Sequence, residues 1–218
     1  MGPKNAYRLA VELKIKDLKD LESKAKQGKI RALAGFGEKS EKEILTAVAD
    51  FKEETRYLLT EAFPIAERVL AHLRSNPACN RAEPLGSSRR MVATVGDIDI
   101  AVASKDPAEI IAHFTKFKEV KKVIGAGPRK AAVLLNNGMQ VDLLVETPDA
   151  YGALLQHFTG SKNHNIKLGE YAIKKGLSLS DYGIKKNGKL LKFKTEEEFY
   201  GYLKMDWIVP EMREDTGE

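Results

Sequence analysis

The chain has 218 residues, of which 43% are hydrophobic and 31% are charged, and this balance predicts a folded protein. No apolar run approaches the roughly 20 residues that a membrane-spanning helix needs, so we expect no membrane association. The single cysteine, Cys79, excludes a disulfide framework and a cysteine-ligated zinc site; with no export signal at the N-terminus, it indicates a cytoplasmic setting. The formal net charge of +5 favours a polyanionic partner such as nucleic acid, although a basic surface also serves solubility.

The first third of the chain predicts helices. Asp17 begins a short helix that Gly28 ends. A capping-box pattern predicts Ser40 as the N-cap of the next helix, with Glu43 three residues on. The stretch "GKIRALAGFGEKSEKEIL" therefore has a helix, a glycine-bracketed turn and a second helix, the pattern of half a helix-hairpin-helix. A longer helical pattern over about 54–74 is expected to kink or break at Pro64.

The middle of the chain predicts a β-sheet with one helix. In "DIDIAVA" the apolar residues alternate with Asp97, Asp99 and Ala101, so the two sets occupy opposite faces of a strand. A helix is expected to begin after Asp106, its N-cap. Further strands are expected near 120–125, 132–135 and 139–145.

The last third predicts a mixed α/β arrangement. "SKNHNIKLGEYAIKKG" has a helical pattern, and "YGIKKNGKLLKF" predicts a hairpin with an Asn187-Gly188 turn. Thr195 is expected to cap a final helix.

Carboxylates on strands are the most informative feature. Asp97 and Asp99 are separated by one residue and point the same way, and Asp142 lies on the corresponding face of "QVDLLV". If the two strands are neighbours, three carboxylates converge and repel one another unless a cation lies between them. Hard oxygen ligands of this number suit Mg²⁺. A single D-x-D is common on solvated sheet edges, so this alternative stays open for the pair alone.

The surroundings favour a site for a triphosphate above a metal. Gly86 and Ser87 offer backbone N–H groups and a hydroxyl upstream of the aspartates, with Arg89 and Arg90 beside them. Gly96 precedes the first aspartate, where the missing Cβ permits close approach by a ligand.

These residues resemble the nucleotidyltransferase signature of the X family of DNA polymerases, the family of DNA polymerase beta. That signature is G-S-x-R-R followed at fixed spacing by G-D-x-D, present here as "GSSRRMVATVGDIDI". "QVDLLV" matches the strand of the third carboxylate, "HFTGSKNHN" the F-T-G-S segment, and "GPKNAYRL" the end of the second helix-hairpin-helix. The pattern is most like that of bacterial and archaeal members.

The resemblance implies an α/β (α+β) fold in three parts. We expect helical fingers with a partial helix-hairpin-helix over 1–55, a nucleotidyltransferase palm with a mixed β-sheet over 56–148, and a small α/β thumb over 149–218. We also expect a polymerase core without the N-terminal small domain and the C-terminal phosphoesterase domain of longer members.

The resemblance also implies roles for individual residues. Asp97, Asp99 and Asp142 would ligate two Mg²⁺ ions, with Mn²⁺ as an alternative, and Asp142 would lie beside the primer 3′-hydroxyl. The residues expected at the nucleotide are Arg56, Gly86, Ser87, Arg90, Gly96, His157, Phe158, Gly160 and Asn165. At the DNA backbone the resemblance implies Gly2 and Lys4. We also expect Arg129 and Lys130 there, because they follow Gly127-Pro128 in a turn between strands.

Four positions depart from the family pattern. His157 stands where eukaryotic members have tyrosine, which predicts a looser sugar gate. Gly169 stands where those members have an arginine that tracks the template, which predicts lower fidelity or slower insertion. Gln140 and Leu144 replace arginines that flank the third carboxylate, so the contacts around Asp142 differ.

The resulting functional prediction is templated addition of dNTPs to a primer 3′-hydroxyl by two-metal phosphoryl transfer, most naturally at short gaps during DNA repair. The expected partners are gapped or primer–template DNA and a dNTP, bound by a monomer in a prokaryotic cytoplasm at the nucleoid. Two alternatives stay open: a template-independent nucleotidyltransferase, and a DNA-binding module that is inactive because it is truncated.

Overall fold

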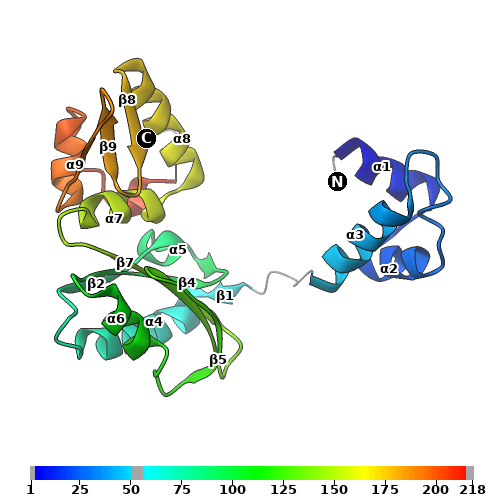
Figure 1. The fold of residues 1–218 in the computed structure, drawn as a ribbon, viewed down its shortest axis with the longest axis horizontal. Coiled ribbons are helices and arrows are strands. Elements are labelled where there is room, and N and C mark those ends of the chain that lie inside the picture. Colours follow the sequence, from blue (N-terminus) through cyan, green and yellow to red (C-terminus); the bar gives the residue numbers. More distant parts are fainter. Residues whose placement is uncertain (1–2, 51–55, 215–218) are drawn as a thin grey trace. The chain divides into compact units, whose positions relative to one another are not determined.

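The computed structural model describes residues 3–50 and 56–214, and the chain divides into two compact units, 1–55 and 56–218 (Figure 1). The mixed α/β fold class predicted above is confirmed. No helix in the described part of the chain combines the length and apolar character that crossing a membrane requires.

The first unit is helical: α1 (Pro3–Glu12), α2 (Leu18–Lys26) and α3 (Glu38–Asp50). The Asp17 side chain caps α2 by accepting a hydrogen bond from the Asp20 N–H at 2.7 Å, as predicted. The prediction that Ser40 is the N-cap of the next helix is wrong, because α3 begins at Glu38 and already contains Ser40. Glu38 and Glu41 occupy its first turn, where negative charge is favoured by the helix dipole.

The second unit contains a five-stranded mixed sheet in the order β2-β4-β7-β6-β5. Its strands are β2 (Arg81–Pro84), β4 (Ile98–Ala103), β5 (Val120–Ala126), β6 (Lys130–Leu135) and β7 (Gln140–Glu146). The central pair, β4 and β7, is parallel, and the other neighbours are antiparallel. The strands predicted in the middle of the chain are therefore present.

Helices cover both faces of this sheet, as Figure 1 shows. On one face pack α4 (Leu59–Arg74) and α6 (Pro107–Phe114). On the other lie the short α5 (Gly86–Arg89) and α7 (Tyr151–Thr159). Because α7 covers it, Ala101 is fully buried although it shares the face of the aspartates.

Helix α4 corrects two expectations. It begins at Leu59, because β1 (Tyr57–Leu58) pairs there with β3 (Thr94–Val95). The sequence analysis expected a kink or a break at Pro64; the helix continues through this residue, so it does not break there. Proline removes one backbone hydrogen bond, whereas the buried face of α4 continues on both sides of it and packs in the main core.

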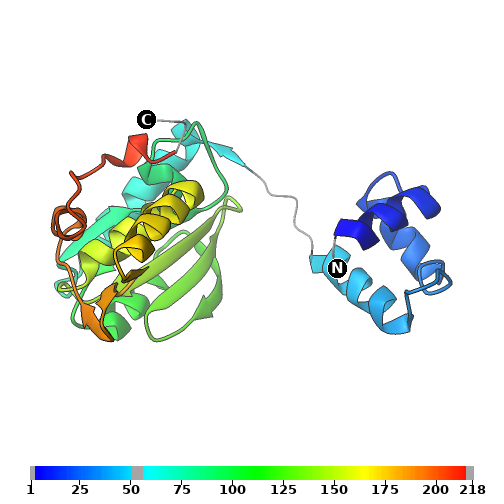
Figure 2. The same ribbon diagram turned by 90° about the horizontal axis from the view of Figure 1, so that it is seen from above.

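The C-terminal third forms its own layer of helices and sheet. Helix α8 (Lys162–Lys174) is followed by the three-stranded sheet of β8 (Leu177–Ser180), β9 (Gly183–Lys186) and β10 (Lys189–Leu191). Helix α9 (Glu196–Tyr202), capped by Thr195 as predicted, and the 3₁₀ helix η1 (Pro210–Met212) complete it. Figure 2 shows the same elements from above.

Candidate active site

Three carboxylates meet where the parallel strands β4 and β7 run side by side. Asp99 on β4 lies directly opposite Asp142 on β7 in the strand register. Asp97 immediately precedes β4, and one oxygen from each of the three lies within 4.8 Å of the others. The structure therefore brings together the three residues that the sequence analysis singled out.

The carboxylates are electrostatically unsatisfied. Burial, together with the charges of Asp97 and Asp142, raises the pKa of Asp99 to about 7, although Arg90 opposes the rise. Burial and the charge of Asp97 also raise the pKa of Asp142. A divalent cation would relieve this repulsion, and three carboxylates are a donor set that suits Mg²⁺.

The turn before the cluster requires glycine. Gly86 has φ +57°, and a Cβ there would lie 2.6 Å from Oδ2 of Asp99. The N–H of Leu85 donates to the backbone carbonyl of Asp99 at 2.8 Å. Any side chain at position 86 would therefore collide with the carboxylate, and Ser87 follows it half-buried in α5.

Arg90 lies between this cluster and the C-terminal third of the chain. Its Nη1 donates to the carbonyl of Thr159, and its Nε donates to the Glu214 carboxylate. Gly160 makes room for it, since a Cβ there would lie 3.1 Å from Nη1. Glu214 is a partner that the sequence analysis did not identify.

Arg56 and Gly96 lie at the near end of the cluster. The Arg56 guanidinium donates to Oγ1 of Thr94 at 2.9 Å and to the Thr94 carbonyl at 2.6 Å. Thr94 precedes Gly96 by two residues, so these bonds hold Arg56 near the start of β4. A Cβ at Gly96 would meet no atom within 4 Å. The space beside Gly96 is therefore not filled by other described residues, and its contact with a nucleotide stays a prediction.

A cavity of about 530 Å³ opens beside two of the carboxylates. Asp99, Asp142, Gln140, Lys130 and Phe158 contribute to its lining, together with residues of the β5–β6 hairpin. Nε2 of Gln140 donates to both oxygens of Asp142, at 2.9 and 3.2 Å. The neutral amide of Gln140 therefore contacts the third carboxylate directly.

His157 and Asn165 lie in a second, smaller cavity of about 190 Å³, which Gly169 also lines. Nδ2 of Asn165 donates to the His157 carbonyl at 2.7 Å, and its Oδ1 accepts from Gln156 at 2.9 Å. The amide of Asn165 is thus held from both sides. A Cβ at Gly169 would meet nothing within 4 Å, so the position is open.

The residues expected at the DNA backbone do not lie together: Lys130 lines the cavity beside the carboxylates, whereas Arg129 does not. Lys130 lines the larger cavity, close enough that its charge opposes the rise in the pKa of Asp142. Arg129 instead pairs with Glu146 and stacks over Tyr182, with 4.7 Å between guanidinium carbon and ring centre. Gly2 and the side chain of Lys4 lie outside the described residues.

A buried ionic network joins α5 to the end of the chain, and the sequence analysis missed it. Arg89 donates to Glu196 at 2.7 Å, and Arg213 donates to the other oxygen of Glu196 at 2.6 Å. Arg213 is 0% exposed and Glu196 is 3% exposed. Burial alone would raise the pKa of Glu196, but the two arginines outweigh burial and lower it.

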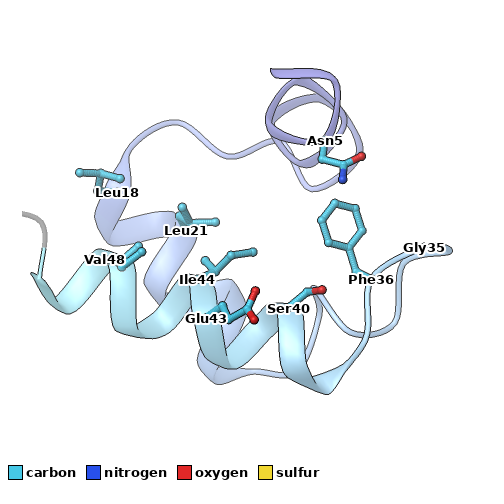
Figure 3. A pocket seen from close by; sticks show the side chains of 10 residues that line it. Asn5, Leu18, Leu21, Gly35, Phe36, Ser40, Glu43, Ile44 and Val48 are labelled. Atoms are coloured by element: carbon cyan, nitrogen blue, oxygen red, sulfur yellow. The ribbon is translucent and has the colours of Figure 1, made fainter. Parts of the chain in front are cut away.

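The first unit carries a cavity of different character (Figure 3). It measures about 310 Å³ and is lined mostly by apolar side chains, including Leu18, Leu21, Phe36 and Ile44. Asn5, Ser40 and Glu43 are the polar residues at its wall. Its lining has no cluster of metal-ligating groups, so the carboxylates of the second unit are the stronger candidate for chemistry.

Comparison with known proteins agrees with this geometry. A family model described as DNA polymerase beta thumb matches residues 154–214. The chain is 34% identical over 223 residues to "DNA polymerase/3'-5' exonuclease PolX" of Bacillus subtilis (strain 168), an alignment that covers 100% of this chain and 39% of that protein. It is 27% identical over 138 residues to "Repair DNA polymerase X" of African swine fever virus (isolate Tick/South Africa/Pretoriuskop Pr4/1996), covering 59% of this chain and 79% of the viral protein. The chain therefore spans about two fifths of the length of the bacterial relative.

Proposed function

We propose that this chain is a polymerase of the X family, as its similarity to PolX and to the polymerase beta thumb indicates, and that it adds deoxynucleotides to a primer 3′-hydroxyl under the direction of a template. The proposed setting is short-gap filling in DNA repair, with gapped or primer–template DNA bound by a monomer. One observation carries the proposal: Asp97, Asp99 and Asp142 offer oxygens within 4.8 Å of one another beside an arginine and a glycine-dependent turn.

The three carboxylates would hold the metal, two Mg²⁺ ions in this proposal, which when bound supplies charge neutralisation for phosphoryl transfer. Asp142 has a raised pKa and borders the larger cavity, so its carboxylate is the proposed acceptor for the proton of the primer hydroxyl. Gln140 keeps that carboxylate oriented by its two hydrogen bonds.

The triphosphate would lie at the turn that begins α5. Gly86 and Ser87 offer backbone N–H groups and a hydroxyl, and Arg90 supplies positive charge for the departing pyrophosphate. Arg56 and the open space at Gly96 flank the same end of the cluster. Phe158 and Gly160 are proposed to lie under the deoxyribose, with His157 and Asn165 at the edge of the base pair.

The test is single-nucleotide gap filling on end-labelled DNA, with each dNTP in turn and with Mg²⁺ or Mn²⁺. We expect extension only by the complementary nucleotide, lost in D99A and retained in D149N, a control that removes an exposed carboxylate paired with Lys192. Equal extension by every nucleotide would favour a template-independent transferase. DNA binding without extension would favour a binding module.

A further inference from the structure

Arg90 is held at two of its three guanidinium nitrogens. Nη1 donates to the Thr159 carbonyl and Nε donates to Glu214, while among the described residues Nη2 has no hydrogen-bond partner. A guanidinium is planar and rigid, so two fixed nitrogens determine the direction of the third. The arginine side chain is only 13% exposed, which limits the alternatives it can adopt.

Glu214 is placed by the best-anchored residue of the C-terminal segment. The preceding residue, Arg213, is fully buried and donates to Glu196 at 2.6 Å and to the Ile208 carbonyl at 2.6 and 2.9 Å. The Arg213 carbonyl also accepts from the Ser161 N–H at 2.9 Å. The side chain and the carbonyl of Arg213 therefore both hold the backbone directly before Glu214.

Arg90 in turn lies next to the carboxylate cluster. The N–H of Arg90 donates to the Gly86 carbonyl at 3.2 Å, and a Cβ at Gly86 would lie 2.6 Å from Oδ2 of Asp99, so the short helix α5 holds Arg90 beside that carboxylate. Its nitrogens contact one backbone carbonyl on α7 and one carboxylate on the C-terminal segment. Nη2, which has no hydrogen-bond partner among the described residues, is therefore free to donate to an anion bound at the cluster.

We propose that Glu214 is a positioning residue that fixes the Arg90 guanidinium so that Nη2 is presented to the phosphates of the incoming nucleotide. The inference rests on the proposed function, because it assigns Arg90 to a nucleotide triphosphate. It adds a residue from the far end of the chain that does not itself contact the nucleotide. Removing Glu214 frees the arginine to rotate, so ordering it again reduces nucleotide affinity.

The test compares E214A, E214Q and E211A in the full chain. Glu211 is an exposed glutamate on η1, so E211A makes the same change of charge three residues away. We expect E214A to raise the KM for the dNTP about 10-fold with kcat changed less than about 2-fold, the loss of one hydrogen bond to a charged group. E214Q keeps an acceptor oxygen for Nε and is expected to restore most of the affinity, whereas E211A has no effect.

A double-mutant cycle with R90A locates the effect. If Glu214 acts through Arg90, E214A changes the KM less than about 2-fold once the arginine is gone. The same loss in both backgrounds, a loss equal to that of E211A, or a fall in KM would each overturn the inference. A fall would mean that Glu214 competes with the phosphates for Arg90.

Calorimetric binding of dATP in the presence of Ca²⁺ separates this inference from the proposed function. Weaker binding by E214A than by the unaltered chain supports the inference even where no primer is extended. Equal binding by the two chains overturns the inference alone. No binding by the unaltered chain overturns both.

Discussion

Two groups of charged side chains lie inside the second unit, and they differ in how their charges are balanced. Glu196 lies between Arg89 and Arg213, and its pKa is lowered in spite of burial. Asp99 lies between two other carboxylates, and its pKa is raised to about 7. The first group is balanced within the protein, whereas the second keeps a repulsion that a cation would relieve. On this account, unbalanced charge that the backbone register holds in place marks the proposed functional site, and balanced charge marks structure.

The largest expected effect is on activity at the unbalanced group. D99N removes a proposed metal ligand, so we expect primer extension to fall on the order of 1,000-fold. Because it also removes repulsion, the melting temperature of the metal-free protein at pH 7.5 should stay constant or rise. A fall in melting temperature would contradict the view that these charges repel in the folded state.

The balanced group should respond in the opposite way. E196A leaves the buried Arg213 and the largely covered Arg89 without their shared partner, so we expect a loss of about 3–5 kcal/mol in the free energy of unfolding, measured in urea. E197A, an exposed neighbour on α9, serves as control and should lose almost nothing. Equal stability of the two variants would contradict a structural role for Glu196 and its two arginines.

The pH dependence of stability sharpens the same contrast. The pKa of Asp99 rises from an ordinary 3.8 to about 7 on folding, so between these pH values the folded chain holds a proton that the unfolded chain releases. Stability in the presence of EDTA should therefore fall as pH rises from about 4 to 7. In D99N this component of the fall should be absent, and Mg²⁺ should stabilise the unaltered chain more at pH 7.5 than at pH 5. Identical profiles for the two chains would contradict the assignment.

A smaller effect is expected at Gln140. Q140L removes both hydrogen bonds to Asp142, so we expect kcat to fall about 10-fold with little change in the KM for the dNTP. Q27L, which removes an exposed glutamine–serine hydrogen bond in the first unit, is the matched control. A change in KM alone would mean that Gln140 contacts the nucleotide rather than orienting the carboxylate.

The smallest effect is expected at Gly169, outside both groups. G169A adds a Cβ to α8 that meets nothing within 4 Å, so it should stabilise the chain by about 0.5–1 kcal/mol through helix propensity. Thermal unfolding measures this shift. A loss of stability would show that the open space beside Asn165 is structurally required.

Local patterns made much of the site predictable from the sequence. Strand periodicity placed Asp97 and Asp99 on one face, and the same rule applied to "QVDLLV" placed Asp142 on the corresponding face. In the structure Asp142 is the register partner of Asp99 on the neighbouring strand. Sequence could not reveal the arginine partners, since Arg89 and Glu196 are separated by 107 residues, and Arg90 and Glu214 by 124. The first residue of α4, the helix that contains Pro64, is set by the pairing of β1 with β3, which local helix propensity does not encode.

Mn²⁺ binding followed by electron paramagnetic resonance at pH 7.5 tests whether the three aspartates form a metal site. We expect the unaltered chain and D149N to bind Mn²⁺ with equal affinity, and D99N to lose at least about 10-fold in affinity. Equal Mn²⁺ binding by D99N and the unaltered chain would contradict a metal site at the three aspartates.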